Sequence, residues 1–170
     1  MRAPFQVLVF PYKPKGEQIL FLICLRSDLG FWQPISGGGE DAETSLEAAK
    51  RELYEETALV GGNWLQLDSM CTLPKTIFDD HMYWPKHLLV VPEYAYSVEV
   101  QGDPLLSSEH SEYRWCDAIE AQKLLKYDSN RIAKTTETSL HLCFSNSFLI
   151  GALVHSLFPS SPFGDRLSLF

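Results

Sequence analysis

The sequence predicts an α/β fold in which a mixed β-sheet is sandwiched between α-helices. Apolar residues make up 45% of the 170-residue chain and charged residues 21%, which is typical of a globular protein. Segments with the composition of β-strands stand before and after a segment with helical periodicity. The resulting order of strands, helix, strands and helix favours a mixed sheet flanked by helices over a strict βαβ array.

The first part of the chain predicts a β-hairpin. Residues 5–12 and residues 18–27 are rich in aliphatic and aromatic side chains, and a polar segment with Pro and Gly separates them. Residues 28–39 then predict a loop that contains a short strand. We therefore expect two neighbouring antiparallel strands at the start of the domain.

Residues 44–57 predict an amphipathic helix. Thr44 is followed three residues later by Glu47, and this spacing is that of a capping box at a helix start. Apolar side chains at helical spacing share one face of the segment: Leu46, Ala49 and Leu53. Because glycine commonly ends a helix, we expect Gly61 and Gly62 to terminate this one.

The second part of the chain predicts three more strands and two more helices. Residues 64–74, 86–100 and 112–117 have strand composition. Residues 117–127 predict a second helix, and residues 129–140 predict the start of a third. These elements complete the predicted sheet and its flanking helices.

The C-terminal end of the chain has an unusual composition. No Asp, Glu, Lys or Arg occurs from Thr138 to Gly164. A membrane span would have to place His141, Asn146 and His155 in hydrocarbon, which is costly, so we expect no membrane association. We assign residues 1–140 to one domain and residues 141–170 to an atypical hydrophobic tail that we expect to begin as a helix packed on it.

The overall charge limits the possible partners. The chain has 14 basic and 22 acidic residues, for a formal net charge of −8. Binding to duplex nucleic acid needs clustered Lys and Arg, so this class of partner is disfavoured. A small phosphate ester remains compatible with an acidic chain if a divalent cation lies between the two negative partners.

The four cysteines favour a reducing environment. Cys24, Cys71, Cys116 and Cys143 are scattered, without the spacing of a zinc site or of a disulfide framework. The apolar run at the N-terminus is too short for a signal sequence and contains prolines. We therefore expect a cytoplasmic protein with reduced thiols, and leave a homodimer as an open possibility.

Three carboxylates crowd one face of the predicted helix. Glu52, Glu55 and Glu56 are related by steps of three and four residues, and they lie near the helix C-terminus. Like charges at this spacing destabilise a helix by about 0.2–0.5 kcal/mol per pair, and the helix dipole adds to the penalty. A hard cation such as Mg²⁺ or Mn²⁺ accounts for the pattern, because these ions take oxygen ligands. The alternative is an ordinary solvated acidic face.

A run of three glycines precedes this helix at residues 37–39. Glycine lets a backbone turn tightly and approach a ligand closely. A glycine-containing loop that leads into a helix is also common on the phosphate side of nucleotide sites. The glycines thus favour a phosphorylated ligand beside the carboxylates.

These residues together resemble a known signature. The Nudix box is G-x5-E-x7-R-E-U-x-E-E-x-G-U, where U is aliphatic. The matching residues here are Gly37, Glu43, Arg51, Glu52, Leu53, Glu55, Glu56 and Leu59. The departure is Ala58, which stands where the box has its second glycine. We expect Ala58 to adopt a left-handed conformation, or Gly61 and Gly62 to form the turn in its place.

The resemblance implies a Nudix fold and a Mg²⁺-dependent hydrolase acting on a phosphoric anhydride. By position, Glu52, Glu55 and Glu56 would bind the metal together with the carbonyl oxygen of Gly37. Arg51 would orient the glutamates through ion pairs, with Glu43 as a partner. The general base varies within the family, and Glu52 is our first choice.

Two flanking motifs are similar to those of the dihydroneopterin triphosphate and dATP pyrophosphohydrolases. Trp32 and Gln33 precede Gly37 as in that subgroup, and the residues from Glu109 to Trp115 resemble its EH-x-x-Y-K-W motif. The resemblance implies that Glu109 is an additional metal ligand, with Glu112 as a competitor.

The resemblance implies cleavage of a nucleoside or pterin triphosphate to the monophosphate and pyrophosphate. Two alternatives stay open. One is hydrolysis of dinucleoside polyphosphates or nucleotide sugars. The other is a noncatalytic nucleotide-binding sensor, although such proteins usually lose box glutamates.

Substrate-binding residues are predicted from residue type. Four aromatic rings can stack on a base or pterin, although each is also consistent with an ordinary core or rim aromatic residue: Trp32, Phe78, Tyr83 and Trp84. Arg26 and Lys86 can bind phosphates, although each is also consistent with an ordinary surface charge.

Overall fold

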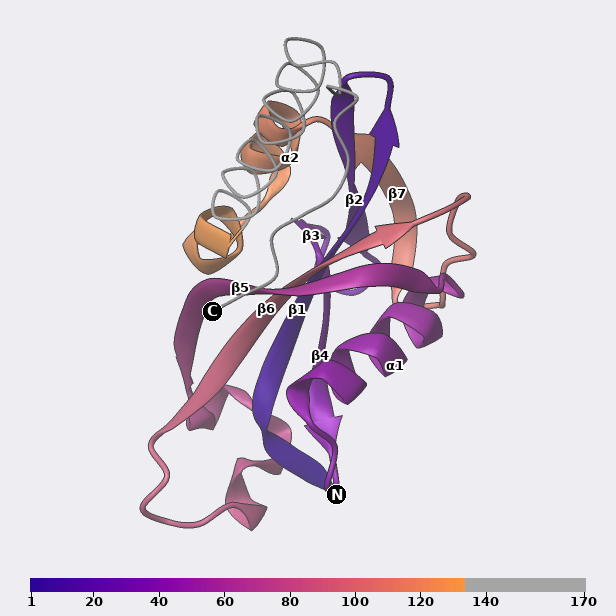
Figure 1. Cartoon of the computed structure of the whole chain (residues 1–170). Coiled ribbons are helices and arrows are strands. Elements are labelled where there is room, and N and C mark those ends of the chain that lie inside the picture. Colours follow the sequence, from indigo (N-terminus) through magenta and orange to yellow (C-terminus); the bar gives the residue numbers. More distant parts are fainter. Residues whose placement is uncertain (134–170) are drawn as a thin grey trace, which may run out of the picture. The chain divides into compact units, whose positions relative to one another are not determined.

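Seven strands form one mixed sheet in the computed structural model (Figure 1). Five lie in the order β3-β2-β1-β6-β5, while β4 pairs with β1 and β7 pairs with β2. Strand β1 runs parallel to β6, and the other pairings are antiparallel. The strands are β1 (Arg2–Lys15), β2 (Gln18–Arg26), β3 (Trp32–Gln33), β4 (Ile35–Glu40), β5 (Gly61–Pro74), β6 (Val90–Val100) and β7 (His110–Cys116).

The structure describes residues 1–133, all of which belong to one unit, Met1–Thr138. The predicted tail, residues 141–170, lies outside the described residues, so its helix and the domain boundary stay predictions. The predicted third helix is described only in part, because residues 128–133 are helical. No helix within residues 1–133 is long and apolar enough to cross a membrane.

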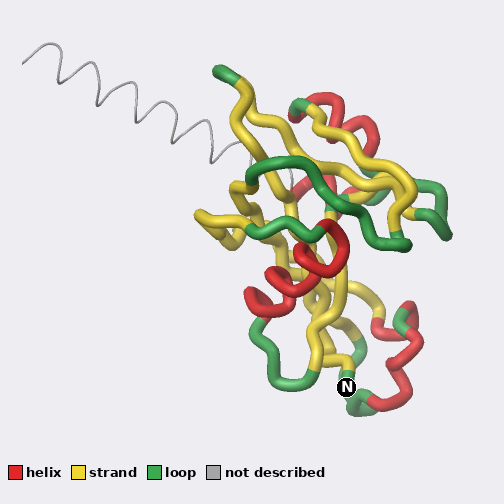
Figure 2. Tube along the Cα trace, turned by 90° about the vertical axis from the view of Figure 1, so that its right-hand side faces the viewer, coloured by secondary structure: helices red, strands yellow, loops and turns green. Residues whose placement is uncertain are grey.

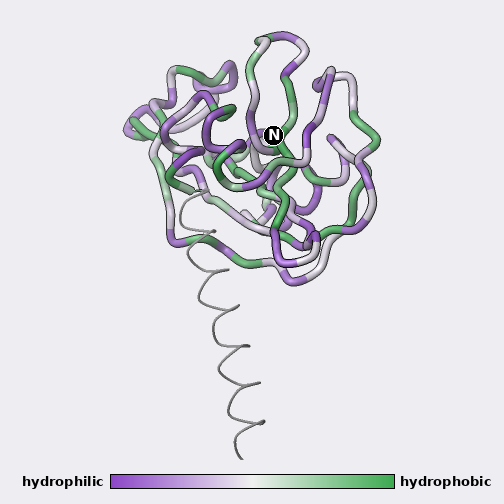
Figure 3. The backbone as a smooth tube through the Cα atoms, turned by 90° about the horizontal axis from the view of Figure 1, so that it is seen from above, coloured by the Kyte–Doolittle hydropathy of each residue, from purple (hydrophilic) through white to green (hydrophobic). Residues whose placement is uncertain are grey.

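Both faces of the sheet are covered, as the sequence predicts. Val7 and Val9 of β1 are fully buried in a core cluster with Ala49 and Leu53 of α1 (Ser45–Thr57). Neighbouring residues of a strand point to opposite faces, so the buried Leu8 and Phe10 lie on the other side of the sheet. Buried residues of α2 (Ala118–Leu124) and of the turn after it contribute to the core, and α2 packs against β2 and β7. Figure 2 shows α1 lying across the strands, and Figure 3 shows hydrophobic and hydrophilic residues interspersed along the chain.

Helix α1 begins as predicted but ends differently. The capping box of Thr44 and Glu47 is present, with both reciprocal hydrogen bonds formed. Ala58 is the C-cap in the left-handed conformation, with φ 55°, and its amide donates to the carbonyl of Tyr54. Gly61 and Gly62 belong to β5, so the prediction that these glycines end the helix is wrong.

The three glycines lie in β4, so the prediction that they belong to a loop before α1 is wrong. None of the three has a positive φ. Each glycine instead makes room for one side chain: a Cβ atom at Gly37 would overlap the carboxyl of Glu52, one at Gly38 the guanidinium of Arg2, and one at Gly39 the ring of Phe5. The run of glycines is therefore explained by close packing on one strand.

The connection between β5 and β6 contains two short 3-10 helices that the sequence did not reveal. They are η1 (Lys75–Ile77) and η2 (Asp79–Tyr83). The predicted strand over residues 86–100 begins only at Val90. This connection forms one wall of the cavity described below.

A buried carboxylate in β6, that of Glu93, makes the free energy of unfolding depend on pH. Glu93 is buried beside the hydroxyl of Ser129, and its Oε1 atom has no hydrogen-bond partner. Burial raises the pKa of the Glu93 carboxyl above its ordinary value of 4.5. The proton is therefore held more tightly in the folded state, and the folded state is penalised as pH rises through this raised pKa.

We expect Glu93→Gln to raise the free energy of unfolding by about 1 kcal/mol at about pH 8. The gain should shrink toward zero at about pH 3.5, below the ordinary pKa of 4.5, where the wild-type carboxyl is largely protonated in both states. Urea unfolding at the two pH values measures the difference. Glu17→Gln, in an exposed turn, is the control. A variant less stable than wild type at the higher pH would contradict the account.

Candidate active site

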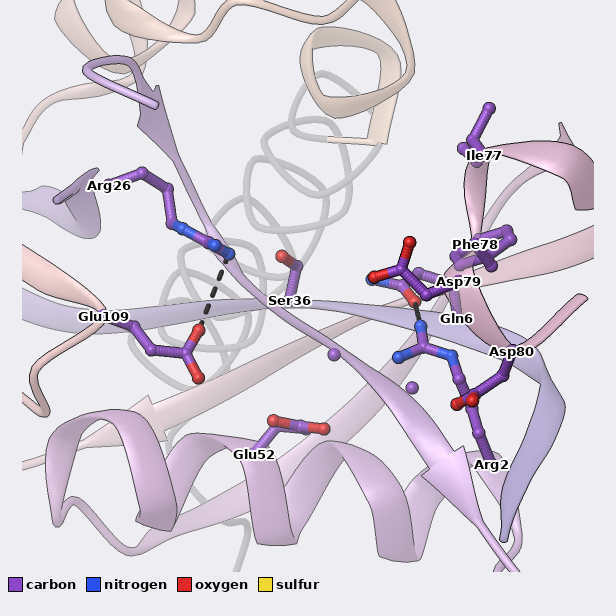
Figure 4. A pocket seen from close by; sticks show the side chains of 12 residues that line it. Arg2, Gln6, Arg26, Ser36, Glu52, Ile77, Phe78, Asp79, Asp80 and Glu109 are labelled. Atoms are coloured by element: carbon purple, nitrogen blue, oxygen red, sulfur yellow. Dashed lines mark hydrogen bonds and ion pairs between the residues drawn. The ribbon is translucent and has the colours of Figure 1, made fainter. Parts of the chain in front are cut away.

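A cavity of about 460 Å³ lies between β1, β4, α1 and the connection that contains η1 and η2. Figure 4 shows Glu52 projecting into it from α1, with Arg26 and Glu109 on one side and Arg2 and Asp80 on the other. Its lining residues are Arg2, Gln6, Arg26, Ser36, Gly37, Gly38, Glu52, Ile77, Phe78, Asp79, Asp80 and Glu109. The cavity is thus bordered by charged groups of both signs.

Arg51 organises the acidic residues around the helix. Its Nε and Nη2 atoms donate to both oxygens of Glu43, at 2.9 and 3.0 Å. Its Nη1 atom donates to Glu52 and to Glu55, each at 2.9 Å, and Nη2 also donates to the carbonyl of Gly38 at 2.8 Å. These bonds use all five N–H groups of the guanidinium. The predicted ion pairs of Arg51, including that with Glu43, are therefore formed.

Glu52 lies against the backbone of Gly37 at the border of the cavity. Burial raises the pKa of the Glu52 carboxyl to about 7. Arg51 opposes this shift, while the neighbouring carboxylates of Glu56 and Glu55 add to it. The negative charge at this position is thus incompletely balanced by the protein.

Glu56 is buried and faces the interior. Its Oε2 atom is 2.6 Å from Nε2 of His110, and the side chains are 4% and 0% exposed, respectively. Burial raises the pKa of the Glu56 carboxyl, and the hydrogen bond to His110 opposes the rise. The pair joins the end of α1 to the start of β7.

Glu55 differs from both neighbours because its side chain is 55% exposed. As a result, the three box glutamates face the cavity, the solvent and the core. Within residues 1–133, no three acidic, His or Cys side chains are already placed to hold a metal ion. All three residues nevertheless project from less than two turns of one helix, and Glu52 lies next to the glycine backbone of β4.

Glu109 and Arg26 meet on one side of the cavity. Nη1 of Arg26 is 3.5 Å from Oε2 of Glu109, and Arg26 also forms a two-bond pair with Asp28 at 2.8 and 2.9 Å. Glu112 does not line the cavity and pairs with Arg114 on the exposed side of β7. Of the two candidate glutamates, the structure therefore brings Glu109 to the cavity.

The other predicted substrate-binding residues are dispersed. Trp84 is buried, and its indole donates to the backbone carbonyl of Arg2 at 2.9 Å. Trp32 is stacked under the guanidinium of Arg114, and Lys86 is exposed; neither lines the cavity. Of the predicted aromatic residues, only Phe78 is in the lining.

Sequence reasoning missed several residues of the site. Arg2, Gln6, Asp79 and Asp80 line the cavity, and His110 holds Glu56. His110 had a usable signal, because it directly follows Glu109 in the motif that resembles EH-x-x-Y-K-W. The others are brought in by strand pairing and by the 3-10 helices, which the sequence pattern does not show.

Comparison with known families identifies the chain. The family model described as NUDIX domain matches residues 3–138. The chain belongs to the NUDIX family. The Nudix fold predicted from the sequence is confirmed, and so is the enzyme class, because the family relatives are hydrolases that act on phosphoric anhydrides. Nudix proteins generally use divalent metal ions.

Individual Nudix relatives agree with this assignment. Dihydroneopterin triphosphate diphosphatase of Escherichia coli (strain K12) is 31% identical over 136 residues, covering 78% of this chain and 90% of the relative. The asymmetrical bis(5'-nucleosyl)-tetraphosphatase of Sus scrofa is 32% identical over 120 residues, covering 68% and 76%. A crystal structure described as a NUDIX hydrolase of Listeria monocytogenes has a TM-score of 0.70 and 36% identity, covering 85% and 97%.

The buried pair of Glu56 and His110 is expected to contribute to the free energy of unfolding of this Nudix protein. We expect His110→Ala to lower the free energy of unfolding by about 3 kcal/mol, because it leaves Glu56 buried without its partner. Adding Glu56→Gln should recover part of the loss, since the unpaired charge is then gone. Urea unfolding of the two single variants and the double variant tests this, with the exposed His87→Ala as control. A double variant that loses the full sum of both single changes would refute the coupling.

Proposed function

We propose that this Nudix protein is a divalent-cation-dependent pyrophosphohydrolase that converts a nucleoside or pterin triphosphate to the monophosphate and pyrophosphate. The observation that carries the proposal is the position of Glu52, pressed against Gly37 at the border of a charged cavity. The similarity to the Escherichia coli dihydroneopterin triphosphate diphosphatase supports the substrate class.

The residues present fit a hard cation such as Mg²⁺ or Mn²⁺. Carboxylate and carbonyl oxygens are the ligands that these ions prefer. The raised pKa of Glu52 reflects burial together with the repulsion of adjacent carboxylates. The positive charge of a bound cation would offset both effects by stabilising the ionised carboxylate. We propose Glu52, Glu55, Glu56, Glu109 and the carbonyl of Gly37 as the groups that would hold it.

The remaining groups act by positioning. Divalent cations supply charge neutralisation on the phosphate oxygens and activate water. Arg51, itself held by Glu43, donates to Glu52 at the border of the cavity and to the more exposed Glu55. Arg26 and Phe78 line the cavity, where Arg26 would contact a phosphate group and Phe78 a ring. Trp32, Trp84 and Lys86 would need another arrangement of the chain to take part.

A second candidate function is hydrolysis of dinucleoside polyphosphates. The similarity to the tetraphosphatase of Sus scrofa favours it, at almost the same identity over a shorter part of the chain. Both functions would use the same glutamates and differ in which bond is broken and in what lies at the far end of the phosphate chain.

Product analysis distinguishes the two candidates. The wild-type protein is incubated with Mg²⁺ and, separately, dATP, GTP, dihydroneopterin triphosphate and diadenosine tetraphosphate. The proposed function predicts pyrophosphate and a monophosphate from one of the triphosphates at the highest kcat/KM. Preferred release of ATP and AMP from diadenosine tetraphosphate would support the second candidate instead. The homodimer and the cytoplasmic location stay predictions.

A further inference from the structure

We propose that Arg2 is a substrate-binding residue that contacts a phosphate oxygen and thereby selects triphosphates over diphosphates. The inference rests on the proposed function and extends it to a residue outside the Nudix box. Arg2 begins β1 and lies across the cavity from Arg26 (Figure 4). Glu52 and the glycine backbone of β4 lie between these two arginines.

The guanidinium of Arg2 has few hydrogen-bond acceptors and no carboxylate partner within residues 1–133. Within residues 1–133 it forms no ion pair and donates one hydrogen bond, from Nη2 to the neutral amide oxygen of Gln6 at 2.6 Å. Its Nε atom is buried without a partner. The other arginines at the site differ, because Arg51 uses every N–H group and Arg26 is paired with Asp28.

The same guanidinium is nevertheless held in place. Its Cζ atom lies 5.0 Å from the centroid of the Phe78 ring, and it rests on the backbone of Gly38, where a Cβ atom would overlap it. The backbone carbonyl of Arg2 accepts the indole N–H of Trp84 at 2.9 Å. Stacking and close packing therefore fix an arginine that has unused donors.

A half-buried cation without a counter-ion is costly unless an anion arrives from outside the chain. Asp79 and Asp80 line the same cavity, yet neither pairs with Arg2. A planar guanidinium fork matches the oxygens of a phosphate group. A phosphate chain that crosses Gly37 and Glu52 from Arg26 needs sufficient length to reach Arg2, so a triphosphate gains a contact that a diphosphate loses.

The test compares Arg2→Gln, Arg2→Lys and wild type on a nucleoside triphosphate and the matching diphosphate with Mg²⁺. The control is Arg114→Gln, which removes a stacked arginine outside the cavity. We expect Arg2→Gln to lower kcat/KM for the triphosphate by about ten- to a hundredfold, with the diphosphate changed by about twofold or less. Arg2→Lys should fall between, because it keeps the charge and loses the fork.

Binding of an α,β-methylene triphosphate analogue, measured by calorimetry, gives a readout that needs no turnover. We expect the affinity to fall by about the same factor in Arg2→Gln, at a melting temperature close to that of wild type. Wild-type values on both readouts would overturn the inference. So would an equal loss on both substrates with a lowered melting temperature, which would indicate that Arg2 only supports the Phe78 wall. A wild-type protein that binds the analogue but hydrolyses nothing would refute the proposed function alone, and the affinities would still decide the role of Arg2.

Discussion

Replacing Glu52 with Gln is expected to lower kcat by about a thousandfold or more while the protein stays folded. The substitution keeps the shape of the side chain and removes the charge that we propose as a cation ligand. Because burial raises the pKa of Glu52 to about 7, removing its charge should leave the melting temperature unchanged or higher at alkaline pH. Loss of activity and retention of stability together would separate a chemical role from a structural one.

The control for this prediction is Glu112→Gln. Glu112 is a partly exposed glutamate that pairs with Arg114 and does not line the cavity. Steady-state rates of pyrophosphate release and melting temperatures of both variants provide the measurement. If Glu52→Gln kept the wild-type rate, Glu52 could not be a metal ligand or the base.

Gly37→Ala is expected to lower kcat/KM by about a hundredfold. The new methyl group would overlap the carboxyl of Glu52, so either this carboxyl or β4 must move. A displacement of about 1 Å at a reacting centre is enough for an effect of this size. Because Gly37 has no positive φ, the effect comes from the contact with Glu52 and not from backbone strain.

Gly62→Ala is the matched control for Gly37→Ala. Gly62 also lies in a strand, and a Cβ atom there would meet nothing within 4 Å. We expect its kcat/KM to stay within about twofold of wild type. A Gly37→Ala variant as active as Gly62→Ala would show that the close contact between Gly37 and Glu52 has no role in catalysis.

Local patterns were sufficient to predict the helix of the site. The capping box of Thr44 and Glu47 is formed, and Ala58 adopts the left-handed conformation that the missing glycine would have taken. Arg51 pairs with Glu43 as the Nudix box implies. All of these contacts join residues close in the sequence, where residue spacing fixes the geometry.

Contacts between distant residues were not predictable in the same way. His110 and Glu56 are 54 residues apart, and only the fold shows that they meet. Arg2 reaches the cavity because β1 pairs with β4 so that Gln6 lies opposite Gly38. Strand register of this kind depends on the packing of the whole sheet, which a single sequence does not specify.

The same limitation explains the errors at the aromatic and glycine positions. Trp84 has a residue type suited to stacking on a ligand, yet it is buried with its indole bonded to the backbone. The glycines of residues 37–39 looked like a loop because composition does not show which side chains will press on a strand. Residue type alone did not distinguish packing from function.

The rate of pyrophosphate release from a triphosphate, measured before and after removal of divalent cations, tests the central claim most directly. The account predicts turnover by the wild-type protein with Mg²⁺, none after treatment with a chelator, and recovery when Mg²⁺ is added back. Turnover that persists unchanged in the chelator, or no pyrophosphate at any concentration of Mg²⁺ or Mn²⁺, would contradict it.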